Sequence, residues 1–294
     1  MSFTTADEKE RDKIIAEILS EIPDVENKVE LGKRIVITGK GGVGKTVISA
    51  VLAYLFAEAG LKVLAVDEDP QMNLPFALGV PFEKANEIIP LNKQLDYIEE
   101  KTGARPGTGW GLFFRLNPDV SDVVDRFGLR IRENLNLLVM GTFQQPGVGC
   151  ACPENDLLQA VVNYINLRKG EVIIMDTEAG LEHFGRAIAK GFHHAVIVSE
   201  PTFNSIFVLN QAVNLAKKLG IPHIHLVFNK VRDEETKVRE ILSGLDSKIL
   251  NLPIYFLPWD ENVFRFEPLV EPLIKSGSPF VLAIKKLFKE LIQN

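Results

Sequence analysis

The sequence predicts an α/β domain with a mostly parallel, doubly wound sheet of about seven or eight strands. Three observations lead to this prediction. Short, continuously apolar runs alternate with segments of helical periodicity along most of the chain, a pattern typical of parallel strands that helices cover on both faces. A glycine-rich loop joins the first run to the first helix. Polar motifs follow directly after several runs, where open sheets of this class bind ligands.

The N-terminal residues 1–33 are expected to form a helical arm outside this pattern. Apolar residues recur there at helical spacing from Ile14 to Ile22, and Pro23 then ends the pattern. The remaining residues, 34–294, are expected to form one domain. Seven apolar runs predict its strands, at 34–38, 62–67, 135–140, 171–176, 194–200, 223–229 and 253–258.

Helices are expected between these runs, at 46–60, 155–167, 181–191, 203–219 and 233–243. Residues 81–130 include a loop rich in glycine and proline and are expected to form short helices and loop over one face of the sheet.

The composition of the chain argues against several classes of function. The chain has 294 residues, of which 46% are hydrophobic, and a formal net charge of −6. This acidic balance offers no overall basic field for nucleic acid. The N-terminal residues lack the basic-then-apolar pattern of a signal peptide, and no run approaches the roughly 18 apolar residues of a spanning helix. We therefore expect a cytoplasmic protein that binds no nucleic acid.

Residues 39–46, GKGGVGKT, fit the pattern G-x-x-x-x-G-K-[ST] between a strand and a helix. This pattern is typical of a P-loop, in which glycines allow a tight turn and backbone N–H groups bind phosphate oxygens. We therefore expect Lys45 to contact the β- and γ-phosphates of a nucleotide and Thr46 to ligate Mg²⁺. The other predicted nucleotide-binding residues of this loop are Gly41, Gly42, Val43, Gly44 and, through its backbone N–H, Val47.

Lys40 directly follows the first glycine and makes the loop resemble the deviant Walker A motif of the MinD/ParA/nitrogenase iron protein class of ATPases. The resemblance implies an ATP-dependent, face-to-face homodimer in which Lys40 reaches the partner's nucleotide. It also implies that Asp69, after the second strand, orients the attacking water. Val47 departs from this class, which often has a hydroxyl residue at that position.

Acidic residues end two of the predicted strands. Asp67 ends the second strand and is expected near the Mg²⁺ shell, and Asp176 ends a later strand and is expected to hold Mg²⁺ through water as a Walker B aspartate. Glu178 and Gly180 then mark a second switch segment, in which the Gly180 N–H is expected to sense the γ-phosphate. A lone aspartate after a strand is more often a helix cap, but three acidic positions beside a P-loop favour a site.

The nucleotide base is expected beside residues 228–231 and 257–260, in contact with Asn229 and Pro258. An asparagine amide can both donate and accept hydrogen bonds at the edge of adenine. Guanine-binding proteins of this superfamily typically have N-K-x-D, and here Arg232 stands where that aspartate would be. The sequence therefore favours ATP over GTP.

Cys150 and Cys152 are the two cysteines of the chain. Thiolates at i and i+2 of an extended segment point the same way, so one chain supplies two soft ligands and a two-fold dimer supplies four. Four sulfurs suit Zn²⁺, Ni²⁺ or an iron–sulfur cluster. The alternative is a buried free pair that packs as small hydrophobes. The neighbouring glycines and Pro153 indicate an exposed turn and favour metal binding.

Taken together, the motifs GKGGVGKT, DEDPQMNLPFALGV, RLNPDV, VMGTFQQPGVGCACPE, DTEAGLEHFGR and FNKV resemble the CooC-type accessory ATPases of nickel-dependent carbon monoxide dehydrogenase. The resemblance spans roughly residues 34–275. It implies an ATP-hydrolysing nickel metallochaperone with carbon monoxide dehydrogenase as its client, and Zn²⁺ or Ni²⁺ bound by Cys150 and Cys152 at the dimer interface. The sequence departs from the family at Thr177, where methionine is common, and in the N-terminal arm, which leaves the client open.

Two alternatives belong to the same class. An iron–sulfur carrier or reductase also bridges a dimer with paired cysteines, but the pair in the reductase lies far apart in sequence. A MinD-like ATPase would bind membrane through a C-terminal amphipathic helix, and residues 279–293 have three lysines opposite an apolar stripe. We favour a final helix packed on the sheet, which makes a membrane partner improbable. His183 is expected to pack or hydrogen-bond rather than ligate metal.

Overall fold

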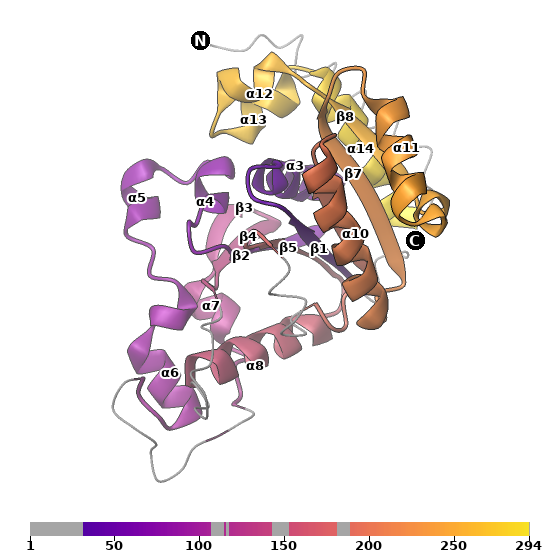
Figure 1. Ribbon diagram of the computed structural model, residues 1–294. Coiled ribbons are helices and arrows are strands. Elements are labelled where there is room, and N and C mark those ends of the chain that lie inside the picture. The colour runs from indigo at the N-terminus through magenta and orange to yellow at the C-terminus, as the bar shows by residue number, and fades with distance from the viewer. Residues whose placement is uncertain (1–31, 107–114, 116–117, 143–152, 181–188, 294) are drawn as a thin grey trace.

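The computed structural model describes residues 32–106, 115, 118–142, 153–180 and 189–293. Within these ranges, eight strands form one sheet in the order β3-β4-β2-β5-β1-β6-β7-β8 (Figure 1). Neighbouring strands are parallel, except β3 and β4, which are antiparallel. The predicted α/β class, the single domain and the mostly parallel sheet are therefore confirmed.

Seven strands lie where apolar runs predicted them, and their bounds are β1 (Lys33–Gly39), β2 (Lys62–Glu68), β4 (Leu135–Val139), β5 (Glu171–Thr177), β6 (His194–Ser199), β7 (His223–Val231) and β8 (Ile254–Pro258). The inner strands β1 and β6 are buried along their whole length because helices cover both of their faces. The eighth strand, β3 (Leu129–Arg132), was not expected. It lies at the sheet edge, where Leu129 pairs with Leu137 of β4.

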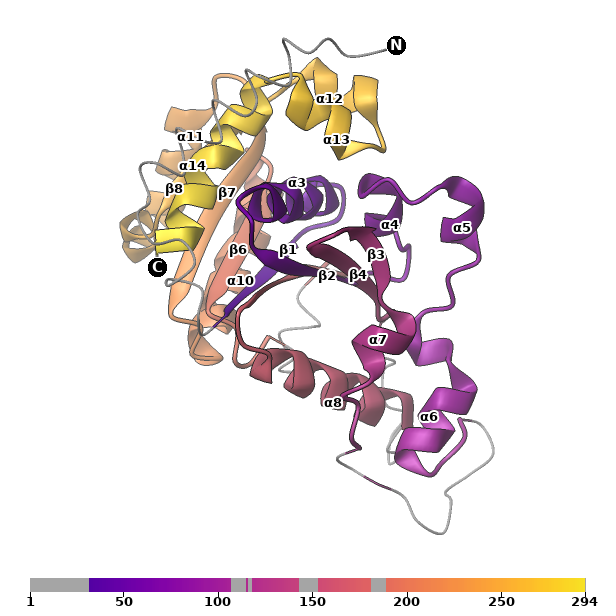
Figure 2. The same ribbon diagram turned by 180° about the vertical axis from the view of Figure 1, so that it is seen from behind.

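Two layers of helices cover the sheet (Figures 1 and 2). One layer, which includes α3, α13 and α14, packs on strand side chains such as Ile35 and Val196. The other, which includes α6, α8, α10 and α11, packs on the alternate side chains such as Val36 and Ile197. The helices are α3 (Lys45–Glu58), α4 (Leu74–Ala77), α5 (Phe82–Asn86), η1 (Leu91–Lys93), α6 (Leu95–Thr102), α7 (Val123–Phe127), α8 (Pro153–Leu167), α10 (Phe203–Lys218), α11 (Glu235–Leu245), η2 (Ser247–Asn251), α12 (Glu261–Phe266), α13 (Val270–Lys275) and α14 (Pro279–Gln293).

The C-terminal helix α14 lies along β8 and α3, as Figure 2 shows. Its apolar stripe, which includes Phe280, Ile284 and Leu291, is buried, and the rings of Phe288 and Phe56 of α3 meet edge to face with centroids 4.8 Å apart. This is the packed final helix that we favoured over a membrane-binding one. Among the described residues, no helix is long and apolar enough to cross a membrane.

Two short helices, α12 and α13, follow β8 and were not predicted. They lie together at one end of the molecule beside α3 (Figure 1). Each has six residues, which is too short for helical periodicity to be recognised in the sequence. The predicted arm lies almost entirely outside the described residues, as does most of the helix expected at 181–191.

Candidate nucleotide-binding site

The carboxyl ends of β1, β2 and β5 lie side by side and bring the predicted motifs together. Asp176 of β5 is the register partner of both Ile37 of β1 and Asp67 of β2. Gly39 at the end of β1 forms an isolated bridge with Gly180, so the start of the P-loop lies beside the segment that follows β5. The parallel register therefore explains why motifs far apart in the sequence meet at one edge of the sheet.

The P-loop backbone depends on glycine at two positions in particular. Gly39 has φ 148° and Gly44 has φ 97°, in the range that residues with a Cβ rarely adopt. A Cβ on Gly39 would lie 2.1 Å from the carbonyl oxygen of Val198, and one on Gly44 would lie 2.4 Å from Nδ2 of Asn229. The loop is therefore packed closely against the carboxyl ends of β6 and β7 before α3 begins at Lys45.

Lys45 is buried inside the loop, with a 6% exposed surface. Its Nζ donates to the carbonyl oxygen of Lys40 over 3.3 Å. Burial lowers the pKa of Lys45, and the charges of Asp176, Asp69 and Glu178 oppose that shift. The ammonium group thus lies among the acidic residues at the strand ends, in position to bind phosphate. Lys40 itself is exposed.

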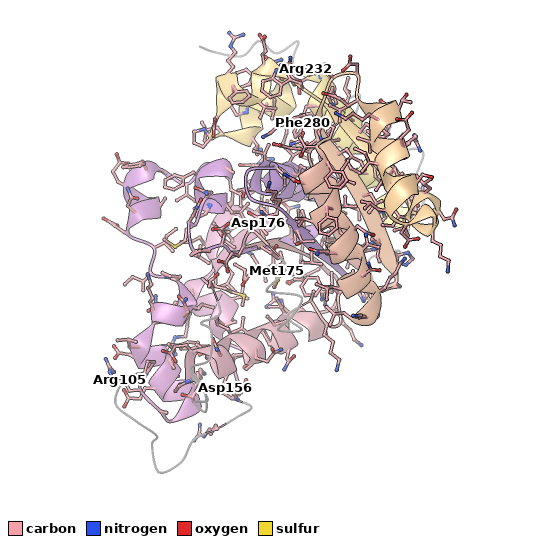
Figure 3. All side chains as sticks on the ribbon, viewed as in Figure 1. Arg105, Asp156, Met175, Asp176, Arg232 and Phe280 are labelled. Atoms are coloured by element: carbon pink, nitrogen blue, oxygen red, sulfur yellow. The ribbon has the colours of Figure 1, made fainter. Side chains whose placement is uncertain are left out.

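Asp176 is almost fully buried, at 1% exposure, and lies near the centre of the molecule in Figure 3. Its Oδ1 accepts a hydrogen bond from Ser49 Oγ at 2.9 Å. Burial raises the pKa of Asp176 to about 6, although hydrogen bonds from Thr46 and Ser49 act in the opposite direction. Its Oδ2 has no hydrogen-bond partner among the described residues. A buried carboxylate oxygen left free beside the Thr46 hydroxyl fits the oxygen ligands that Mg²⁺ prefers.

Ser49 contacts Asp176 although it belongs to no sequence motif. It lies one helical turn after Lys45, and its hydroxyl is also 3.0 Å from the carbonyl oxygen of Lys45. The pattern of the P-loop ends at Thr46, so only helical spacing on α3 would have placed Ser49 on the same face.

Asp67 and Asp69 organise the loop after β2. Asp67 Oδ1 accepts from the backbone N–H of Asp69 at 2.9 Å, and Asp67 Oδ2 accepts from the N–H of Leu74 at 3.1 Å. Burial and the charge of Asp176 hold the pKa of Asp67 well above its usual value. Asp69 Oδ1 in turn accepts from the N–H of Gln71 at 2.8 Å. Both carboxylates therefore hold the loop after β2 from within, and this loop contains the residue expected to orient the attacking water.

The predicted second switch segment is bonded to its neighbours at both ends. The Glu178 N–H donates to Glu68 Oε2 at 3.2 Å, and the Gly180 N–H donates to the carbonyl oxygen of Gly39 at 3.2 Å. The hydroxyl of Thr142, beyond the end of β4, lies 3.0 Å from Glu178 Oε2. No sequence motif pointed to Glu68 or Thr142, since both contacts depend on strand order.

A cavity of about 180 Å³ lies where the base was expected, between the P-loop and the end of β8. Val47, Asn229, Pro258, Trp259 and Phe280 are among its lining residues. Figure 3 shows Phe280 and Arg232 in this part of the molecule. The walls are mostly apolar, as binding sites for planar bases tend to be. The guanidinium carbon of Arg232 lies 4.9 Å from the Trp259 ring centroid.

Asn229 contacts the P-loop directly. Its Nδ2 donates to the carbonyl oxygen of Val43 at 2.8 Å, and its Oδ1 accepts from the N–H of Lys230 at 2.8 Å. The side chain therefore supports the loop, while its predicted contact with adenine stays a prediction. Lys230, which was not predicted as a site residue, donates through Nζ to the carbonyl oxygen of Gly42 at 2.8 Å and to Glu200 Oε1 at 2.6 Å.

The predicted transition-metal ligands Cys150 and Cys152 lie outside the described residues, and so does His183. Within the described ranges, no group of three or more histidine, cysteine, aspartate or glutamate side chains is arranged to hold a metal ion.

The fold resembles those of MinD structures. The cell division ATPase MinD of Pyrococcus furiosus superposes with a TM-score of 0.60 at 22% identity, over 88% of this chain and 98% of that one. MinD of Pyrococcus horikoshii, solved with Mg-ADP, gives 0.59 at 22% identity, over 88% of this chain and 95% of that one.

Sequence comparison finds more similar relatives. The uncharacterized ATP-binding protein MJ0823 of Methanocaldococcus jannaschii is 42% identical over 261 residues, which are 88% of this chain and 98% of that protein. The carbon monoxide dehydrogenase accessory protein CooC of Rhodospirillum rubrum is 39% identical over 198 residues, which are 67% of this chain and 74% of that protein. The model of the CobQ/CobB/MinD/ParA nucleotide binding domain matches residues 35–268. The chain therefore belongs to the CobQ/CobB/MinD/ParA family and is a P-loop ATPase.

Proposed function

We propose that this ATPase is a nickel metallochaperone that matures carbon monoxide dehydrogenase, and that ATP-dependent dimerisation controls metal binding by Cys150 and Cys152. One observation carries the proposal. The segment 143–152, which contains both cysteines, begins after Thr142 and ends before Pro153 of α8. Thr142 contacts Glu178 at the edge of the sheet that holds the P-loop, so the last described residue before the cysteines lies beside the predicted second switch segment. The 39% identity to CooC supports this choice of client.

In this proposal each residue of the nucleotide site has its own role. The P-loop N–H groups and Lys45 bind the phosphates, with the backbone N–H of Val47 next to them, and Asp69 orients the attacking water. Thr46, Asp176 and, more distantly, Asp67 hold Mg²⁺, which neutralises charge on the phosphates when bound. The free Oδ2 of Asp176 supports this assignment.

Dimerisation would complete the metal site. Lys40 is exposed at the mouth of the P-loop and in the dimer would reach the partner's nucleotide. Two copies of C-x-C would then supply four thiolates to Zn²⁺ or to the cargo Ni²⁺. Hydrolysis would separate the copies and weaken metal binding, since each chain alone keeps only two ligands.

Metal analysis of the anaerobically purified protein tests the proposal. We expect about one metal ion per dimer with a non-hydrolysable ATP analogue, and loss of that metal in Cys150→Ser and Cys152→Ser. Sedimentation on the same samples should show dimers that depend on nucleotide. Equal metal content in the wild type and both variants would contradict the proposal. A brown iron-containing protein would instead support the iron–sulfur carrier.

The client is tested separately. Carbon monoxide dehydrogenase produced together with this protein should need less added nickel for full activity than the same enzyme produced with Lys40→Ala. An equal nickel requirement with wild type and with Lys40→Ala would contradict the proposal that carbon monoxide dehydrogenase is the client. The MinD-like alternative has less support, because the apolar stripe of α14 is packed on β8 and α3.

A further inference from the structure

β3 (Leu129–Arg132) forms one edge of the sheet and pairs with a neighbour, β4, on one side only. In a strand, the backbone N–H and C=O groups of alternate residues point to opposite sides, so some of those in β3 point away from β4. Within the described ranges, the backbone of residues 129–132 makes no hydrogen bond beyond its ladder with β4. The outer edge of β3 is therefore open, and an open edge can pair with another chain.

A groove follows this open edge. Its first part is a hollow of about 410 Å³ between β3 and the residues that join α4 to α5, which lie next to β3 in Figure 2. All four residues of β3 line this hollow, and Gly79, Val80 and Lys84 are among those that line its other side. Because successive strand residues point to opposite faces of a sheet, a hollow that touches all of them lies at the edge rather than over one face.

A second hollow of about 390 Å³ continues the groove, since Leu129 and Lys84 line both hollows. Its lining is mainly apolar and includes Ile88, Ile89 and Phe127, and Ile89 is 58% exposed. A segment that adds a strand to a sheet edge gains affinity from backbone hydrogen bonds and specificity from pockets that take alternate side chains. The open edge and its two hollows offer both kinds of contact.

The charge of the groove indicates which segment fits it. Arg130 and Lys84 are exposed cations of the first hollow, and neither has an acidic partner among the described residues. Glu271, an acid that lines the same hollow, already pairs with Arg132 at 2.9 Å and with Lys275 at 3.0 Å. Two positive charges therefore remain in this hollow, in a chain whose formal net charge is −6. Such a local charge favours an acidic partner.

From these observations we infer that β3 is a docking site for an extended, acidic segment of another protein, which pairs with β3 as an added strand. Acidic side chains of that segment lie beside Arg130 and Lys84. An apolar side chain enters the second hollow, where Glu87 disfavours a further acid. Because β3 has four residues, the backbone bonds are few and the complex is transient. The inference goes beyond the proposed function and does not depend on metal binding.

A second copy of this chain is a poorer occupant. Pairing β3 with itself would bring Arg130 and Arg132 of one copy beside the same residues of the other, and like charges across a strand pair are destabilising. Sedimentation of the wild type without nucleotide should show monomers. Dimers that an acidic peptide dissociates would assign the edge to a second copy and overturn the inference.

A labelled synthetic peptide in which valine alternates with glutamate is the probe for this site. We expect fluorescence anisotropy to show saturable binding to the full chain, and much weaker binding of a matched peptide with lysine in place of glutamate. Absence of saturable binding would overturn the inference, because the arginines would then only keep the edge from aggregating.

Backbone pairing is tested on the peptide itself. N-methylation of either the valines or the glutamates removes the N–H groups from one side of the extended peptide. One of the two methylated peptides should lose binding and the other should keep it, since a strand that pairs at a sheet edge uses one side only. Equal affinities of the two methylated peptides would contradict strand addition.

Charge-reversed variants locate the peptide on the groove. Arg130→Glu and Lys84→Glu should each weaken binding of the glutamate peptide about two- to fivefold, and the double variant should prefer the lysine peptide. Lys217→Glu, on the exposed surface of α10, makes the same charge change away from the groove and should bind like wild type. Arg130→Gln serves if thermal melting shows that the glutamate variant does not fold. Unchanged affinity in the groove variants, or an equal loss in Lys217→Glu, would overturn the inference.

Discussion

Ser49 Oγ donates a 2.9 Å hydrogen bond to Oδ1 of Asp176, and this contact leaves Oδ2 as the free oxygen of a buried carboxylate. The bond joins the first helix to the fifth strand across 127 positions of sequence. It fixes the rotation of the carboxylate and favours its charged form, which is the form that a magnesium ion requires.

Ser49→Ala should therefore weaken Mg-ATP hydrolysis. Hydrogen bonds to charged groups contribute about 1.5–3 kcal/mol, so we expect kcat/KM at neutral pH to fall roughly tenfold or more. The loss of kcat/KM should be smaller at higher pH. Without the Ser49 hydroxyl, the Asp176 carboxyl ionises at a higher pH, and above that pH it is again charged. Steady-state rates between pH 6 and 9 measure both effects. Ser49→Thr, which keeps the hydroxyl, is the control, and equal pH profiles for Ala and wild type would contradict this role.

Asp176 should destabilise the metal-free protein as pH rises. Its folded pKa is about 6 against a usual value of 3.8. The stability that the protonated form contributes is full below pH 3.8 and is lost as pH rises through 6. By pH 7.5 the loss amounts to about 3 kcal/mol. In urea unfolding, Asp176→Asn should gain stability over wild type across this range, and added Mg-ATP should reverse the order. Parallel pH curves for the two proteins would refute the shift.

A buried histidine pair should have the opposite effect and make the folded protein less stable as pH falls. His194 Nδ1 and His225 Nε2 are 3.2 Å apart. They lie near the amino ends of β6 and β7, which are the ends away from the nucleotide site. Burial lowers the pKa of His225 to about 4, and burial together with His225 lowers that of His194 to about 2. The unfolded chain therefore binds protons first as pH falls below 6.5.

Unfolding free energy should consequently fall with acidification between pH 6.5 and 4, by roughly 1.4 kcal/mol per pH unit for each histidine. His225→Gln should remove about half of that slope. Urea unfolding at several pH values gives the slope directly, and an unchanged slope in the variant would mean that the pair is not neutral in the folded protein.

Lys230 should tune nucleotide affinity through the P-loop backbone. It bonds both the carbonyl oxygen of Gly42 and Glu200, so Lys230→Met frees the loop without removing a phosphate ligand. The ion pair with Glu200 is partly exposed and contributes little by itself. We expect KM for ATP to rise several-fold with little change in kcat, since the loop binds ground state and transition state alike.

Glu200→Gln should produce a smaller rise than Lys230→Met, because the bond to Gly42 remains. Lys217→Met, on the exposed surface of α10, is the matched charge control and should leave KM unchanged. A fall in kcat at constant KM in Lys230→Met would indicate a role in the chemical step instead.

The sequence by itself determined seven of the eight described strands, helix α3 and the phosphate loop. Continuous apolar runs such as Ile35–Ile37 specify buried strands locally, and the glycines of residues 39–46 specify a turn that few other residues can form. The motif residues Lys45, Thr46 and Asp176 could be predicted as site residues because each follows a strand or opens a helix within a few residues. None of these features depends on the order of the strands in the sheet.

The tertiary structure alone decided which side chains and backbone groups from distant segments meet. Ser49 with Asp176, Thr142 with Glu178, and Asn229 with Val43 are pairs from distant parts of the chain. They form because β5 lies between β2 and β1, and β7 lies beyond β6. Strand order is set by packing over the whole sheet rather than by local periodicity. The edge strand β3 and the helices α12 and α13 were missed for the related reason that short elements depend on their neighbours for stability.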